Sequence, residues 1–152
     1  MSDERPRFVV DSMLGSLARW LRMLGYDTTY AKDLEDEDIV RLATDEGRTI
    51  VTRDRELALK PGAILIDEEE LDLQLKAIHE KLSLTLDESA IRCSSCNGTL
   101  TDLPKEEASG LVPEGALESN EVFWRCESCG KAYWRGTHWI GIMERLRRLN
   151  LA

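Results

Sequence analysis

Two cysteine pairs with the same spacing constrain the fold of this chain more than any other feature. They lie 29 residues apart and consist of Cys93, Cys96, Cys126 and Cys129. Two residues between thiolates allow a tight turn to present both sulfurs to one ion, and Gly98 and Gly130 stand where such turns need a positive φ. Four thiolates complete a tetrahedral Zn²⁺ shell and leave no position for water, so the sequence predicts a structural zinc site.

The alternatives to zinc fit these cysteines less well. Two disulfides would require an oxidising compartment, and a redox Cys-x-x-Cys motif needs only one pair. The N-terminus, Met1 to Pro6, is charged and leads directly into a strand-like segment, so we expect no secretory signal and a cytoplasmic protein with reduced thiols. No stretch approaches the roughly 18 uninterrupted apolar residues of a spanning helix, so no membrane partner is expected.

Strand and helix patterns alternate through the first half of the chain. Short apolar or β-prone runs predict strands at 8–10, 28–30, 49–51 and 63–66. Helical spacing of apolar residues predicts helices over about 14–24, 38–46, 55–60 and 71–82. This order predicts an α/β domain over residues 1–88, with a parallel sheet flanked by helices on both faces.

The second half loses this periodicity. Residues 101–120 are polar and contain two prolines, and we expect them to form a mobile insertion between the cysteine pairs. Residues 139–149 predict a final helix. The second module therefore spans 89–152 as a zinc ribbon with a C-terminal helix.

Charge separates the same two parts of the chain. The whole chain has 20 Lys and Arg against 29 Asp and Glu, a net charge of −9, which argues against coating nucleic acid by bulk attraction. Residues 123–152 carry 6 basic against 2 acidic residues, a net charge of +4. The candidate phosphate contacts in this basic segment are Arg125, Lys131, Arg135, Arg145, Arg147 and Arg148.

Aromatic residues are interleaved with these basic residues. They are Phe123, Trp124, Tyr133, Trp134 and Trp139. Such a mixture can stack bases and neutralise phosphates. The alternative, which we favour for most of them, is that a small zinc module needs large side chains to form any core.

Carboxylates at the ends of the expected strands form a second constellation. Asp11 follows the first strand, Asp54 follows the third, and Asp36 begins the helix after the second, with Asp38 close by. Parallel strands place their carboxyl ends at one edge, where α/β folds hold their sites. Oxygen ligands suit Mg²⁺ or Mn²⁺, which activate water against phosphodiesters. The alternative for Asp36 and Asp54 is a helix N-cap.

Motifs in both halves resemble the Mut-seven C-terminal RNase family, a PIN-like domain fused to a zinc ribbon. In the first half they are Asp11 to Asp27, Asp36-x-x-Ile39-x-x-x-Ala43-x-x-x-Gly47-Arg48 and Val51-Thr-Arg-Asp54. In the second half they are Cys93-x2-Cys96-Asn97, Phe123-Trp-x-Cys126-x2-Cys129 and Tyr133-Trp-x-Gly-Thr-His-Trp139. The resemblance covers residues 8 to about 143, and its motifs are specific in combination.

The resemblance implies a PIN-like nuclease in which acidic residues bind a divalent metal and cut RNA. Asp11, Asp36 and Asp54 match the acidic positions of the family. Where some relatives have Thr-Arg-Asp-x-Asp this chain has Glu56, so Glu56 and Asp38 compete for a fourth acidic role.

Two residues beside these acids are expected to shape the cleft. Thr52 is placed to orient Asp11 or a water molecule, and Arg53 to meet the scissile phosphate. The alternative is that both only stabilise the loop.

The sequence therefore predicts a cytoplasmic, Mg²⁺- or Mn²⁺-dependent ribonuclease with a structural zinc ribbon that aids RNA binding. Its expected partner is RNA, with ribosomal and transfer RNA as candidates. The main alternative is a non-catalytic RNA- or ribosome-binding adaptor that retains the PIN-like fold and needs no metal among the acids.

Overall fold

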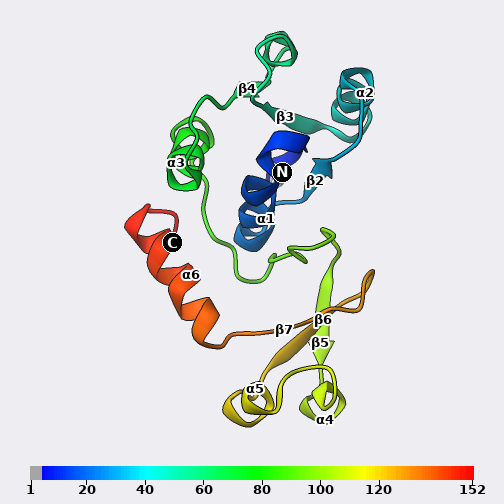
Figure 1. The fold of residues 1–152 in the computed structure, drawn as a ribbon, viewed down its shortest axis with the longest axis vertical. Helices are drawn as coiled ribbons and strands as arrows, with labels where there is room; N and C mark the ends of the chain where they lie inside the picture. Colours follow the sequence, from blue (N-terminus) through cyan, green and yellow to red (C-terminus); the bar gives the residue numbers. More distant parts are fainter. Residues whose placement is uncertain (1–4) are drawn as a thin grey trace.

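Four parallel strands in the order β2-β1-β3-β4 form the sheet of the first half (Figure 1). The strands are β1 (Arg7–Asp11), β2 (Thr28–Ala31), β3 (Arg48–Thr52) and β4 (Ile64–Leu65). A computed structural model describes residues 5–152, so the expected lack of a signal sequence rests partly on residues 1–4, outside the described range. The fourth strand is shorter than the predicted run at 63–66.

Helices cover both faces of this sheet, as the alternating pattern predicts. They are η1 (Ser12–Leu14), α1 (Gly15–Leu24), α2 (Asp36–Glu46), η2 (Leu57–Leu59) and α3 (Leu71–Leu82). Side chains alternate along β1, so Phe8 and Val10 join the core with α1 and α3, whereas Val9 packs with α2 and η2. The α/β fold with a parallel, helix-flanked sheet is confirmed.

The C-terminal helix α6 (Thr137–Arg148) completes the core of the first half. Ile142, Leu146 and Leu151 are buried in the same cluster as the residues of α1 and α3. The backbone carbonyl of Leu151 accepts a hydrogen bond from the N–H of Leu86 at 3.0 Å. The C-terminal end of α6 lies near α3 (Figure 1), where Arg145 and Arg148 pair with Asp72, so a helix of the second module contributes to the core of the first half.

The ribbon contains an antiparallel sheet in the order β5-β6-β7. Its elements are β5 (Leu100–Leu103), α4 (Lys105–Ala108), α5 (Glu114–Ser119), β6 (Phe123–Cys126) and β7 (Ala132–Trp134). Residues 101–120, expected to form a mobile insertion, contain most of β5 and two short helices. Leu103, Ala108 and Val112 bury against Phe123, and such isolated apolar residues leave no periodic signal.

No helix in residues 5–152 combines the length and the apolar character needed to cross a membrane.

Candidate functional site

Asp11 is buried at the carboxyl end of β1, with 8% of its surface exposed. Its Oδ1 accepts a hydrogen bond of 3.1 Å from the N–H of Met13, which starts the turn into α1. Its Oδ2 accepts hydrogen bonds from the hydroxyl of Thr52 and, at 3.0 Å, from the N–H of Arg53. A carboxylate offers about four acceptor positions, so the orientation of Asp11 is fixed while one position stays available.

The hydroxyl of Thr52 connects Asp11 to Asp54. Thr52 is fully buried at the end of β3, where it donates to Asp11 and accepts a 2.9 Å hydrogen bond from the N–H of Asp54. A single hydroxyl therefore fixes the start of the loop after β3 relative to the end of β1. Threonine suits this position because its β-branch fits the strand while its hydroxyl both donates and accepts.

Asp54 is exposed and lies two residues before Glu56, the N-cap of the short helix η2, so it is not the N-cap itself. Its Oδ1 accepts hydrogen bonds from the N–H groups of Glu56 at 2.8 Å and Leu57 at 3.1 Å and so supports the start of η2. Glu56 is exposed. The guanidinium of Arg53 donates to the carbonyl of Glu68 at 2.7 Å, which connects the loop after β3 to the segment that leads into α3.

Asp36 and Asp38 lie in the first turn of α2. Glu35, not Asp36, is the N-cap, and Asp38 completes the capping box by accepting a hydrogen bond from the N–H of Glu35 at 3.4 Å. Asp38 also pairs with Arg41 at 3.0 Å. The N-cap alternative for Asp36 is therefore wrong, and its exposed carboxylate lies at the first helical position.

The acidic residues share an edge of the sheet but do not form one tight cluster. Asp11 pairs in register with Ala31, and Asp36 follows five residues after that position. Within residues 5–152, the four cysteines are the only group of three or more His, Cys, Asp or Glu whose ligand atoms all lie within 4.8 Å of one another.

The four cysteine sulfurs are positioned to bind one metal ion. Tetrahedral Zn–S bonds of about 2.3 Å place sulfurs about 3.8 Å apart. The Cys93 and Cys129 sulfurs are 3.7 Å apart, and the Cys96 and Cys126 sulfurs are 3.4 Å apart. The N–H groups of Ser128 and Cys129 point to the Cys126 sulfur at 3.4 Å each, as in thiolate sites with outer-shell support. The donor set fits a structural zinc.

Two of these thiols have pKa values shifted in opposite directions. Burial alone would raise the pKa of Cys126, but N–H donors from Cys129 and Ser128 lower it to about 6. Burial and the contact with the Cys126 sulfur raise the pKa of Cys96 to about 12. The contact between the two sulfurs lowers one pKa and raises the other, and a bound dication would favour the thiolate at both because coordination deprotonates thiols.

The first cysteine turn reaches a left-handed conformation at an unexpected residue. Asn97 has φ of 70°, and Gly130 in the second turn has φ of 81°, whereas the predicted positive φ at Gly98 is wrong. Gly98 is needed for space instead, since a Cβ there would lie 2.6 Å from the Cys126 sulfur.

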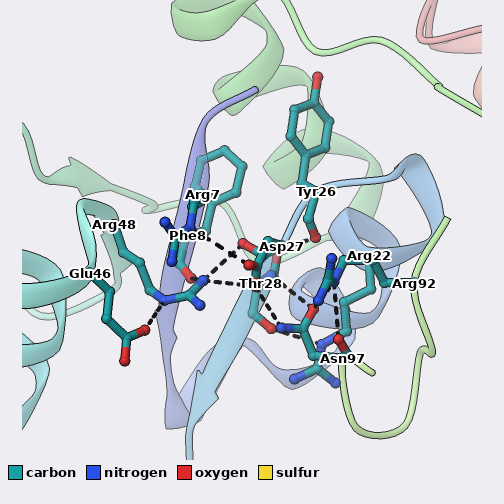
Figure 2. Close-up of polar contacts among 10 residues, drawn as sticks. All are labelled: Arg7, Phe8, Arg22, Tyr26, Asp27, Thr28, Glu46, Arg48, Arg92 and Asn97. Carbon is teal, nitrogen blue, oxygen red and sulfur yellow. Dashed lines mark hydrogen bonds and ion pairs between the residues drawn. The ribbon is translucent and has the colours of Figure 1, made fainter. Parts of the chain in front are cut away.

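Asn97 also docks the first cysteine turn onto the parallel sheet (Figure 2). Its side-chain oxygen accepts from the N–H of Thr28 at 3.0 Å, and its amide donates to Asp27 at 2.7 Å. Arg22 donates to the carbonyls of Thr28 and Ser94 at 2.9 Å each. Sequence reasoning missed this junction, although the Asn directly after Cys96 belongs to the quoted motif.

Most of the candidate phosphate contacts already have partners within the chain. Arg145 and Arg148 pair with Asp72 at 2.5 Å and 3.7 Å, and the Arg125 guanidinium donates to the carbonyl of Gly130 at 3.1 Å. Lys131 donates to the Ser95 hydroxyl at 3.2 Å. Arg135 pairs with Glu88 at 2.8 Å. Arg147 is exposed on α6.

The aromatic residues of the ribbon divide into two groups. Phe123 is fully buried in the small core, as expected. Trp124, Tyr133, Trp134 and Trp139 are half-buried and line a cavity. Trp134 also packs against the small core and Trp139 against the core of the parallel-sheet half, so the expectation of a core role holds for three of the five and does not describe Trp124 and Tyr133.

Comparison with known proteins gives one match. A family model described as Mut7-C RNAse domain matches residues 6–146, nearly the whole chain. The chain has no match among the curated proteins or among the solved structures.

Proposed function

We propose, because this chain belongs to the Mut7-C RNAse domain family, that it hydrolyses RNA phosphodiester bonds with the help of Mg²⁺ or Mn²⁺. The observation that carries this proposal is the buried Asp11 carboxylate, which is oriented by Thr52 and by the backbone of Arg53. Burying a carboxylate is costly, and three hydrogen bonds from Met13, Thr52 and Arg53 offset this cost for Asp11. Its remaining acceptor position is available to a cation.

Asp36 and Asp54 are proposed to complete the cation site with Asp11, with Asp38 or Glu56 as a fourth acid. Mg²⁺ retains several waters and takes one or two carboxylates directly, so the acids need not all touch one ion. A divalent cation bound there lowers the pKa of water and stabilises the leaving oxygen. The Thr52 hydroxyl and the N–H of Arg53 hold the Asp11 carboxylate in place, and Thr52 also accepts a hydrogen bond from the N–H of Asp54.

The four cysteines are proposed to bind one structural Zn²⁺, which holds the ribbon against the sheet. A reducing compartment such as the cytoplasm would keep the thiols available. The basic residues at 125, 131, 135, 145, 147 and 148 are proposed to contact RNA, with ribosomal and transfer RNA as candidate substrates.

The test is cleavage of labelled RNA by purified, zinc-loaded protein in Mg²⁺ or Mn²⁺. We expect wild type to cleave and Asp11→Asn to lose at least about a hundredfold in rate, as for loss of a group that holds the reacting water. Lys76→Ala, an exposed change on α3, should cleave normally. Equal cleavage by wild type and Asp11→Asn would contradict the assignment.

The second candidate is a non-catalytic RNA-binding adaptor. Asp11, Asp36 and Asp54 do not all bring ligand atoms within 4.8 Å of one another, which favours it. An adaptor would bind RNA with the same affinity in Mg²⁺ or in chelator and would release no product, which the same assay measures.

A further inference from the structure

We propose that the cleft between the zinc ribbon and α6 binds an unpaired nucleotide of the RNA, with its base stacked on Trp124. This inference deepens the proposed function and rests on it for the identity of the ligand. The cleft is a cavity of about 460 Å³, a volume within the range of small-ligand sites. It is larger than the cavity of about 260 Å³ beside Arg5 and Asp27.

One face of the ribbon sheet forms the floor of the cleft. Asp102 pairs in register with Trp124, and Trp124 pairs with Tyr133. Residues paired across antiparallel strands point to the same face, so these three side chains form a row across β5, β6 and β7. Sheets with exposed aromatic residues are a recurrent platform for single-stranded RNA.

The walls add a second aromatic residue and a cation. Trp139 comes from the first turns of α6. The Arg135 guanidinium carbon lies 5.0 Å from the centre of the Trp124 ring and 5.1 Å from that of Trp139. Guanidinium planes and indole rings both stack on bases without regard to sequence.

The charges at the cleft suit a nucleotide better than a purely apolar ligand. Arg92, Lys131 and Arg135 line it, against the acids Glu88 and Asp102, and Glu88 is held by Arg135. The cations can meet phosphates, while the Asp102 carboxylate can accept from the amino group of a base. This excess of positive charge lies in a chain whose net charge is −9.

The cleft is remote from the proposed cleavage site. Met23, at the end of α1, lines it, whereas Asp11 lies just before the start of the same helix, which spans ten residues or about 15 Å. The bound nucleotide therefore lies at a distance along the RNA from the scissile bond. Changes in the cleft should raise KM for long RNA and leave kcat, and they should not affect substrates too short to reach it.

The first experiment changes only the RNA. Anisotropy measures binding of zinc-loaded full chain, in the absence of Mg²⁺ and Mn²⁺, to a short labelled single strand, to the same strand with abasic positions, and to its duplex. We expect the intact single strand to bind at least about fivefold more tightly than either other probe. Equal affinity for all three probes overturns the proposal.

The second experiment changes the protein. Trp124→Ala and Trp139→Ala should each weaken single-strand binding by roughly 5- to 100-fold, the range for loss of one stacked base. Trp124→Phe keeps an aromatic face and should retain most of the affinity, and Lys76→Ala should bind as wild type does. Should an alanine variant not fold, Trp124→Phe and the abasic probe still decide the question.

Cleavage separates this proposal from the nuclease assignment. Asp11→Asn should bind RNA normally and fail to cut it. If wild type prefers intact single strands but cuts none of them, the cleft proposal stands and the nuclease proposal is refuted. If wild type cuts RNA but Trp124→Ala and Trp139→Ala change neither the affinity nor the KM, the nuclease proposal stands and the cleft proposal is refuted.

Discussion

The Asn97 side chain donates a hydrogen bond of 2.7 Å to Asp27 across 70 residues of sequence. Asn97 follows Cys96 in the first cysteine turn, and Asp27 precedes β2, so this contact joins the metal site to the parallel sheet (Figure 2). Arg48 donates to the same Asp27 oxygen at 3.0 Å. One carboxylate therefore joins the first cysteine turn to β3 of the sheet, and we expect the stability of the turn and of the sheet to be coupled through it.

Replacing Asn97 should weaken this junction without straining the turn. Asn97→Gly keeps a residue suited to φ of 70° but removes the amide, and the loss of its bonds to Asp27 and Thr28 should cost about 1–3 kcal/mol of unfolding free energy. Urea unfolding measures the loss. Asn120→Ala, which removes only a bond to Ala116, should cost less than half as much. Equal losses in the two variants would contradict the coupling.

The junction also predicts a pH dependence. Burial alone would raise the pKa of Asp27, but hydrogen bonds from Asn97 and Arg48 outweigh it and hold the pKa below its ordinary value of 3.8. A carboxyl with a lowered folded pKa stabilises the fold above the ordinary value, and this contribution is lost as the pH falls through the folded pKa.

Unfolding free energies of wild type and Asp27→Asn between about pH 7 and pH 3 test this sign. The difference should be largest near neutral pH and should shrink on acidification. A difference that grows at low pH would be incompatible with the lowered pKa.

The sequence predicts the local elements well because their signals are local. Helix α1 follows from its leucine spacing and ends at Gly25, which has φ of 102°. Residues 101–120 escape prediction because Leu103 and Val112 are separated by polar residues and become a core only when Phe123 folds over them. A contact such as Asn97 to Asp27 depends on tertiary docking, which no local pattern encodes.

The candidate site shows the same division. Adjacent parallel strands β1 and β3 bring Asp11 and Thr52 together, as the strand order implies. The hydrogen bonds of Asp54 to the N–H groups of Glu56 and Leu57 form within a local turn. The position of Asp36 relative to Asp11 depends on the loop between β2 and α2, for which the sequence carries no packing signal.

Gly98 should be essential for metal affinity, because the absence of a Cβ at this position leaves room for the Cys126 sulfur. A Cβ at this position would lie 2.6 Å from the Cys126 sulfur and 2.9 Å from the Ser128 hydroxyl. We expect Gly98→Ala to reduce zinc affinity at least about tenfold, as outer-shell changes do, measured by competition with a chromogenic chelator. Gly141→Ala, within α6 and open to solvent, should leave affinity unchanged and stabilise the helix. Unaltered affinity in Gly98→Ala would refute this steric reading.

Thr52 should act through the orientation of Asp11. Thr52→Val keeps the shape of the side chain but removes the hydroxyl that donates to Asp11 and accepts from Asp54. We expect kcat for RNA cleavage to fall at least about tenfold, with little change in KM, because a misplaced catalytic group costs rate more than binding. Thr52→Ser restores the hydroxyl and should recover most of the rate. A fall in both variants alike would point to packing rather than orientation.

Helix α6 should stabilise the parallel-sheet half as strongly as a helix of that half. Leu146 is fully buried in the core that α1 and α3 build, so Leu146→Ala should cost about 2–5 kcal/mol of unfolding free energy. Ile140 on the same helix is 59% exposed, and Ile140→Ala should cost less than about 0.5 kcal/mol.

If residues 1–88 form an independent domain, as the expected boundary at residue 88 implies, they should be stable without α6. A fragment tests this. A fragment of residues 5–88 lacks the buried Ile142, Leu146 and Leu151, and its core would be exposed along the face that α6 covers. Circular dichroism should therefore show that the fragment unfolds without cooperativity, while the full chain unfolds in a sharp transition. Cooperative unfolding of the fragment at the temperature of the full chain would instead establish residues 1–88 as an independent domain, because α6 would then add nothing to its stability.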